Sequence, residues 1–287
     1  MAKWPELRRR LEGAGFTIDE RPTRAPGDAT TIARDTLREG ADTIIAVGGD
    51  GTIHEVANGF VEGGAPIRSD ARLGILPCGS GSDFIRTLGL PADAAGAIER
   101  LAHGASEPID LGKATYSSPS GSRESRYYVN SASVGLSGAV LATLATYPEA
   151  FSNSIGYMLA SVSTMATYRP ERMAVTADDT EYPTEPLMMA VVGNGRYFGG
   201  GMHVLPRAKL DDGLLDVLLL RDRPFWELLV HFPRLYAGTH LDLDMVRWSP
   251  AKRARIEGTG LVEIDGEQPG RGPVDFEILP GAIRIIR

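Results

Sequence analysis

A glycine-rich loop that carries one carboxylate is the part of this sequence most suited to chemistry. Residues 48–52 read Gly-Gly-Asp-Gly-Thr and follow the apolar run 43–47. The run predicts a buried strand, and residues from about 52 to 61 predict a helix after the loop. Glycines allow backbone conformations that other residues avoid, and the helix turns its positive N-terminal end toward the loop. These features predict a nucleotide-phosphate site, with Asp50 beside a phosphate-bound metal ion.

A second loop of the same kind lies further along the chain. Residues 73–76 predict a strand, residues 79–82 read Gly-Ser-Gly-Ser, and Asp83 begins a predicted helix at 83–88. Loops at the C-terminal ends of parallel strands can converge on one crevice. We therefore expect Asp50 and Asp83 to supply two carboxylates near one nucleotide.

Helices and strands alternate over the first hundred residues. Strands are predicted at 16–18, 42–47 and 73–76, and helices near 5–13 and at 28–39, 52–61, 83–88 and 92–103. Such alternation is typical of a parallel sheet that is covered on both faces.

Strand-like segments dominate after about residue 108, with helices at 137–146, 155–168 and 224–236. The strands are predicted at 109–116, 126–132, 173–177, 187–192, 215–220, 253–256, 261–264, 276–278 and 283–286. This spacing favours antiparallel architecture. We predict an α/β domain at 1–107 and a β-rich domain at 108–287, with a cleft between them.

Composition limits the classes of function. The 287 residues carry a net charge of -7, which argues against nucleic acid as the main partner. Cys78 is the only cysteine, so the chain cannot form an internal disulfide, and no apolar run reaches the length of a membrane span. The first residues show no apolar signal-peptide segment. We expect a cytoplasmic protein.

Five segments resemble one family. GGDGTIHEVANGF at 48–60 and LGILPCGSGSDFIRTLGLP at 73–91 resemble the diacylglycerol kinase catalytic domain family, above all its bacterial soluble lipid kinases. Three later segments also resemble this family: the glycine-rich stretch 193–206, KLDDGLLD at 209–216 and EIDGE at 263–267. The resemblance implies a parallel α/β domain related to NAD kinases, then a β-sandwich, with the active site between them.

The resemblance also implies roles for individual residues. Asp265 would be the general base on a lipid hydroxyl, and Glu267 would help to hold Mg²⁺. Asp212, with the main-chain oxygens of Lys209 and Leu214, would bind a second, structural Mg²⁺. Such roles suit phosphoryl transfer, which needs positioning, charge neutralisation and a proton acceptor, and Mg²⁺ prefers oxygen ligands. The ATP phosphates would be held by Gly48, Gly49, Asp50, Gly51, Thr52, Gly79, Ser80, Gly81 and Asp83.

The sequence departs from the family pattern in three places. The family begins with a strand that carries an Asn-Pro, and nothing before Lys3 supplies it, so we expect a shortened start and exposed apolar sheet edges. Ser82 stands for a usual Asn, whose reach a serine hydroxyl lacks, and Ser80 stands for a usual Thr.

Several features also have simpler interpretations. Asp211-Asp212-Gly213 and Asp265-Gly266 are strong turn signals. The five histidines lack metal-ligand spacing, so we expect them to be structural or exposed. The basic cluster at 247–255 is either a solvated strand face or a docking patch for anionic lipids. The apolar helices at 137–146 and 155–168 are either core or the lining of an acyl-chain groove.

The leading functional prediction is an ATP- and Mg²⁺-dependent kinase that phosphorylates a diacylglycerol-like lipid at the membrane surface. An NAD kinase is the alternative enzyme, although the chain lacks the Asn-Glu dipeptide of NAD kinases. A catalytically weak lipid- or nucleotide-binding regulator is the alternative from another class. The sequence leaves open which lipid is the acceptor and whether exposed strand edges pair into a homodimer.

Overall fold

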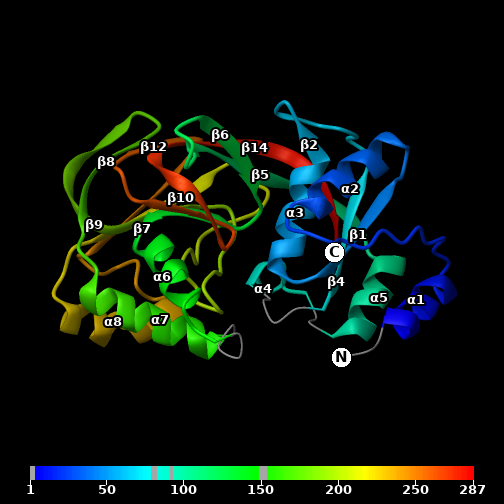
Figure 1. The fold of residues 1–287 in the computed structure, drawn as a ribbon, viewed down its shortest axis with the longest axis horizontal. Helices are drawn as coiled ribbons and strands as arrows, with labels where there is room; N and C mark the ends of the chain where they lie inside the picture. Colours follow the sequence, from blue (N-terminus) through cyan, green and yellow to red (C-terminus); the bar gives the residue numbers. More distant parts are fainter. Residues whose placement is uncertain (1–3, 79–82, 91–92, 149–153) are drawn as a thin grey trace.

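The computed structural model describes residues 4–78, 83–90, 93–148 and 154–287, and it has two halves (Figure 1). The first half alternates helices with strands, and a small separate hairpin consists of β2 (Val61–Glu62) and β3 (Ala65–Pro66). Its other elements are α1 (Trp4–Gly13), α2 (Asp28–Arg38), β1 (Thr43–Gly48), α3 (Asp50–Phe60), β4 (Arg72–Pro77), α4 (Asp83–Thr87) and α5 (Ala94–His103).

The sheet of the first half is parallel and covered on both faces, as predicted. Strand β1 pairs with β4, which places Ala46 opposite Ile75. Buried side chains of α2 and α3, among them Leu37 and Phe60, pack on one face. Leu11 of α1 and Leu101 of α5 pack on the other face with Leu76. Burial of both faces explains why these strands are apolar along their whole length.

The predicted strand at 16–18 is wrong, because these residues form no ladder. Phe16 and Ile18 instead pack their side chains against the core between α1 and α5. Within the described residues, β1 has a paired neighbour on one edge only, which is β4. Val47 on β1 is 37% exposed, as expected for an apolar sheet edge.

The second half is built mainly from antiparallel strands around a buried apolar core. Three helices, α6 (Leu136–Leu144), α7 (Ser154–Thr167) and α8 (Phe225–Ala237), lie together along one side of it (Figure 1). The strands are β5 (Ser106–Ser117), β6 (Arg123–Tyr128), β7 (Ser131–Gly135), β8 (Glu171–Ala177), β9 (Thr180–Gly193), β10 (Leu215–Arg221), β11 (Val246–Ala251), β12 (Arg253–Glu257), β13 (Leu261–Ile264) and β14 (Glu267–Ile286).

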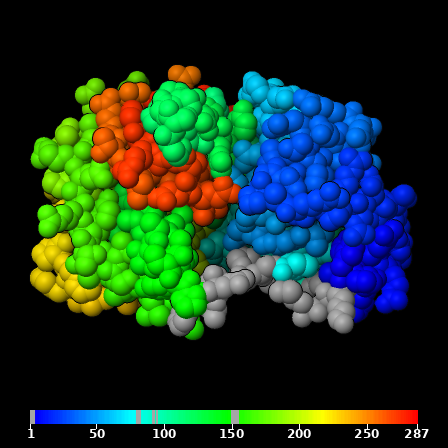
Figure 2. Space-filling view, in the orientation of Figure 1, coloured from blue at the N-terminus to red at the C-terminus, as the bar shows by residue number. Residues whose placement is uncertain are grey.

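Two long strands join the halves. Strand β5 pairs with β14 along most of its length, and the far end of β14 pairs in parallel with β4, which places Ile285 opposite Leu73. The near end of β14 forms a hairpin with β13. A single strand therefore connects that hairpin with the sheet of the first half. Figure 2 shows the two halves side by side and in contact.

No helix in the described part of the chain is both long and apolar enough to cross a membrane.

Candidate active site

Asp265 lies at the tip of the hairpin between β13 and β14, where the turn signal of Asp265-Gly266 predicts it. Ile264 and Glu267 are paired across the hairpin, so the turn contains only two residues. Both have positive φ angles, 44° for Asp265 and 87° for Gly266. Two-residue hairpins prefer this geometry, and Asp followed by Gly tolerates it. The turn and the projecting carboxylate are thus products of the same dipeptide.

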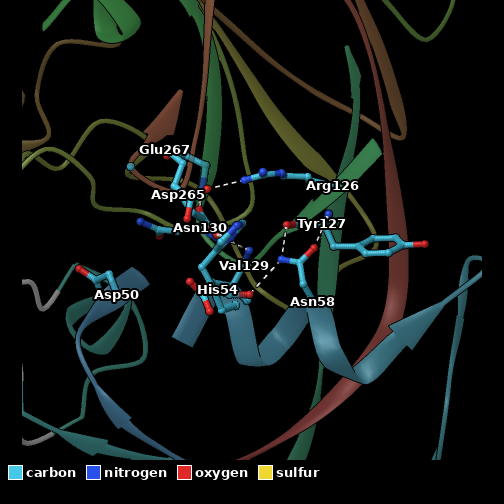
Figure 3. A network of polar contacts seen from close by, with 12 residues as sticks. Asp50, His54, Asn58, Arg126, Tyr127, Val129, Asn130, Asp265 and Glu267 are labelled. Atoms are coloured by element: carbon cyan, nitrogen blue, oxygen red, sulfur yellow. Dashed lines mark hydrogen bonds and ion pairs between the residues drawn. The ribbon is translucent and has the colours of Figure 1, made fainter. Parts of the chain in front are cut away.

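The carboxylate of Asp265 is buried and accepts four hydrogen bonds (Figure 3). The main-chain N–H groups of Val129, Asn130 and Ser131 donate to it over 2.8, 3.1 and 2.8 Å. His54 Nδ1 lies 2.9 Å from its Oδ2. Because a carboxylate has about four acceptor positions, Asp265 has none left over in this arrangement.

These contacts also explain why the strand predicted at 126–132 is broken. Strand β6 ends at Tyr128 and β7 begins at Ser131. Between them, the N–H groups of Val129 and Asn130 point to Asp265 instead of to a neighbouring strand. The sequence of this segment carries no signal for the break, since the acceptor lies more than 130 residues away.

His54 on α3 is a candidate site residue that its sequence context did not single out. His54 is buried, as expected for a structural histidine, but its ring contacts Asp265, the predicted base. Burial lowers the pKa of His54, yet the hydrogen bond and negative charge of Asp265 outweigh burial, so the net pKa is raised. The histidine can therefore carry a proton at the carboxylate.

Asn58 follows His54 by one helical turn and ties the same helix face to β6. Its side-chain amide donates to the main-chain oxygens of Tyr127, over 2.8 Å, and His54, over 2.9 Å. Its Oδ1 accepts from the N–H of Tyr127 over 2.9 Å (Figure 3). The spacing of four residues puts both polar side chains on one face of α3, a signal that could have identified them.

Two further carboxylates lie on the strands of this hairpin. Glu267 is 39% exposed and forms an ion pair with Arg126 of β6 (Figure 3). Glu263 is buried and accepts from the N–H of Gly266 and the hydroxyl of Ser133. Burial raises the pKa of Glu263 to about 7, against the effect of those two hydrogen bonds. Glu267 is thus the accessible carboxylate, and Glu263 supports the turn from within.

Asp50, in the first glycine-rich loop, contacts the start of helix α4. Its carboxylate accepts from the main-chain N–H groups of Asp83, over 3.0 Å, and Phe84, over 3.3 Å. It therefore caps the start of α4, where N–H groups have no partner within the helix. Helix α3 begins at Asp50 itself, two residues earlier than predicted.

The glycines of the first loop do not supply unusual backbone angles, and one of them, Gly48, allows a close approach. Gly48, Gly49 and Gly51 all have ordinary φ angles, contrary to our expectation. A Cβ atom at Gly48 would lie 2.3 Å from Thr52 Oγ1, so a larger residue would displace the threonine. Positive φ angles occur instead at Gly199, Gly200 and Gly201, at 71°, 79° and 99°.

Asp83 connects α4 with that second-half glycine loop. It accepts from the N–H of Gly200 over 2.9 Å and pairs with Arg86 over 3.3 Å. Burial raises the pKa of Asp83 despite these contacts. Asp50 and Asp83 therefore lie together, and their shared role at one nucleotide stays a prediction. The other predicted residues of this loop, Gly79, Ser80 and Gly81, and the substituted Ser82, lie outside the described residues.

Asp212 belongs to a different acidic group. It is exposed, and its Oδ1 accepts from the N–H of Leu214 over 3.1 Å. Burial raises the pKa of the neighbouring Asp110 and Asp216, to about 6 for Asp216. The negative charge of Asp212 adds to the rise of both pKa values. Among the described residues, no three His, Cys, Asp or Glu side chains form a cluster that could hold a metal ion. The roles of Asp212, Lys209 and Leu214 stay predictions.

The charge balance near the first loop fits a bound cation. Burial raises the pKa of Asp50, and the negative charges of Asp83 and Asp265 add to that rise against its two main-chain hydrogen bonds. A divalent cation would relieve this excess. Mg²⁺ needs no cage of side chains, because it commonly uses one or two carboxylates together with substrate phosphates and water. The residues present therefore fit Mg²⁺ that arrives with a nucleotide.

An apolar cavity borders the glycine loop 199–201. It lies among α6, α7, α8 and strands β9 to β11, and Tyr157, Phe198, Met202 and Leu228 are among its lining residues. A Cβ atom at Gly199 would lie 2.7 Å from the Tyr157 ring, so the loop and the cavity wall are in contact. Because Gly200 in the same loop binds Asp83, the cavity adjoins the carboxylate site.

Comparisons with known proteins identify the family of this chain. The family described as diacylglycerol kinase catalytic domain matches residues 2–114, and the YegS C-terminal NAD kinase beta sandwich-like domain matches residues 130–287. A YegS-like lipid kinase of Pseudomonas aeruginosa is 32% identical over 95% of this chain and 85% of that protein. A diacylglycerol kinase of Staphylococcus saprophyticus is 30% identical, with the same two shares of 95% and 85%.

A solved structure has the same fold. The crystal structure of a diacylglycerol kinase from Bacillus anthracis superposes with a TM-score of 0.74 at 28% identity, covering 96% of this chain and 88% of that one. The chain therefore belongs to the diacylglycerol kinase family, and it is a lipid kinase.

Proposed function

We propose that this protein transfers the γ-phosphate of ATP, bound with Mg²⁺, to the hydroxyl of a diacylglycerol-like lipid. One observation carries the proposal, namely the contact between His54 and Asp265. His54 lies on the helix that begins at the first glycine-rich loop, and Asp265 lies at the hairpin tip of the second half. The contact brings a loop suited to phosphate and a carboxylate suited to proton transfer into one site.

The loop side would hold the nucleotide. Main-chain N–H groups at the start of α3, with Gly48, Gly49, Gly51 and Thr52, would bind phosphate oxygens. The loop at Gly79, Ser80 and Gly81 is proposed to complete the site with Asp83, on the family resemblance. Asp50 and Glu267 would hold Mg²⁺, which neutralises charge on the transferring phosphoryl group. Asp212 with the carbonyls of Lys209 and Leu214 is proposed for the structural Mg²⁺.

The hairpin side would remove the hydroxyl proton. A carboxylate can only accept hydrogen bonds, so we assign the contact between His54 and Asp265 to an Nδ1–H donor on the histidine. That tautomer leaves the lone pair on His54 Nε2 to accept the proton of the lipid hydroxyl. Asp265 acts as the base through His54, because its negative charge stabilises the imidazolium that results.

The apolar cavity would take an acyl chain. Its wall includes Tyr157 and Leu228, and its border is the loop whose Gly200 N–H binds Asp83. An acyl chain in the cavity would leave the lipid hydroxyl at the edge of the carboxylate site. This arrangement supports a lipid as acceptor in preference to a polar nucleotide such as NAD.

Transfer of labelled γ-phosphate into a panel of acceptors in mixed micelles tests the proposal. The panel contains diacylglycerol, phosphatidylglycerol, a sphingoid base and ceramide, with NAD as a control, and each is assayed with and without Mg²⁺. Mg²⁺-dependent label in diacylglycerol is the expected result. Label in NAD alone, or no label in any lipid with well-folded protein, would contradict the proposal.

A further inference from the structure

Exposed apolar side chains gather on two helices of the second half. Eight of the nine large apolar side chains that are exposed in the described part of the chain belong to α7 or α8. The ninth is Val47, on the other half of the molecule. Trp226 and Val230 of α8 are 65% and 66% exposed, and Leu159 of α7 is 45% exposed. We call the eight exposed apolar side chains of α7 and α8 the α7–α8 face.

The two helices are apolar on both sides. They are in contact with each other and lie together at one edge of the molecule (Figure 1). Their inner sides line the apolar cavity, with Tyr157 from α7 and Leu228 and Phe232 from α8. A large exposed apolar patch normally marks a surface that binds a partner protein or a membrane. Protein covers only the inner side of these two.

The charged side chains beside the face on α8 have partners on the protein. Helix α7 contains no charged residue. On α8, Glu227 pairs with Arg223 over 3.4 Å, and Arg234 pairs with Asp242 over 2.8 Å. Trp226 and Tyr236 bring aromatic rings with one polar atom each, the side chains that are enriched where a membrane meets water.

The basic cluster at 247–255 is a weaker docking candidate. Arg247 pairs with Glu185 over 3.2 Å, and Arg255 pairs with Asp275 over 2.6 Å and with Glu257 over 3.0 Å. These arginines already have acidic partners on the protein. Arg247 and Arg255 are therefore less available to anionic headgroups than unpaired arginines would be.

We propose that the α7–α8 face inserts into the boundary between headgroups and acyl chains of a lipid bilayer. This inference rests on the proposed function. Insertion of the face would give the acyl chain of the lipid acceptor a route from the bilayer, between α7 and α8, into the cavity. Insertion of apolar side chains at the interface binds a protein to neutral lipids and is little weakened by salt.

Val230→Glu is the test, and Val47→Glu is its matched control on the opposite half. Both place a carboxylate at an exposed valine, so both proteins should fold, which a melting curve verifies. Binding to phosphatidylcholine vesicles is measured without ATP, at low and high salt. We expect Val230→Glu to reduce vesicle binding at least tenfold and Val47→Glu to leave it unchanged.

Trp226 provides a second, independent measurement. Vesicles whose acyl chains carry bromine should quench part of the tryptophan fluorescence, and Trp226→Phe should remove that quenching. The other two tryptophans, Trp4 and Trp248, lie outside the face and should be insensitive. Equal vesicle binding by both valine variants, or quenching that survives Trp226→Phe, would overturn the proposal. A wild-type dimer that Val230→Glu dissociates, without any vesicle binding, would assign the face to a second copy instead.

Failure of this inference can be distinguished from failure of the proposed function. Phosphorylation of a short-chain, monomeric diacylglycerol does not require a bilayer, so Val230→Glu should retain it. Activity on that lipid without vesicle binding would refute the α7–α8 face alone. Vesicle binding through the face, without phosphorylation of any lipid, would refute the kinase acceptor while supporting the face.

Discussion

The carboxylates on the two sides of the site are held in different ways. On the hairpin, the carboxylates of Asp265 and Glu267 each contact a side chain that can carry positive charge. Asp265 contacts His54, and Glu267 contacts Arg126. The loop carboxylates, Asp50 and Asp83, rely mainly on main-chain N–H groups, and burial raises the pKa of both. The protein itself therefore balances the negative charge of the hairpin carboxylates, whereas the negative charge of the loop carboxylates is only partly balanced. This difference favours proton transfer at Asp265 and His54 and cation binding at the loop carboxylates, to which the exposed Glu267 would add a ligand from the hairpin.

Asp265→Asn should have the largest effect. An amide cannot stabilise the imidazolium of His54, so we expect kcat to fall between about 10²- and 10⁴-fold. ATP binding, measured by calorimetry, should be nearly unchanged, because the nucleotide contacts lie on the loop side. Asp83→Asn serves as the comparison and should weaken ATP binding. Undiminished turnover by Asp265→Asn would remove this residue from the proton transfer.

His54→Asn should come next, with a loss of about 10²-fold. Asparagine keeps an N–H donor for Asp265 but has no nitrogen that titrates. Since the pKa of His54 is raised above its usual 6.5, the neutral form that accepts a proton prevails only above that raised value. We expect kcat/KM of the wild type to rise with pH through that region. A pH profile of His54→Asn that keeps the same rise would assign it to another group.

Asp50→Asn should show a smaller effect, confined to the cation. Asparagine still caps α4 through its carbonyl oxygen, so the protein should fold, but the negative charge is lost. The Mg²⁺ concentration for half-maximal activity should increase about tenfold, within the range for changes around a metal site. An unaltered Mg²⁺ requirement would show that the spare charge of the loop side does not bind the cation.

Asp212→Ala should have the smallest effect, on stability. If Asp212 helps to bind a structural Mg²⁺, its loss should lower the Tm in Mg²⁺ buffer by about 2–4 °C, which corresponds to ~1 kcal/mol for a domain of this size. With EDTA the difference should shrink to the contribution of the hydrogen bond from Leu214. Identical melting curves in Mg²⁺ would refute the structural metal site.

Local patterns in the sequence determined the elements and the order of the motifs. The apolar run before Gly48, the Asp265-Gly266 turn and the apolar helices at 137–146 and 155–168 each depend on neighbouring residues, and all appear in the structure. The strand at 16–18 did not form, because a strand also needs a neighbour to pair with, and local sequence does not provide one.

Only the tertiary structure decided which side chains meet at the site. Asp265 is separated from His54 by 211 residues, and its other three donors are main-chain N–H groups, which no residue type reveals. His54 therefore seemed one of five scattered histidines until the long strand β14 carried the hairpin to α3. In the same way, apolar residues of α7 and α8 predict a helix but do not tell which side faces protein, because burial depends on what packs against it. The sequence by itself determined the chemistry that was available, and packing between the halves decided where it was assembled.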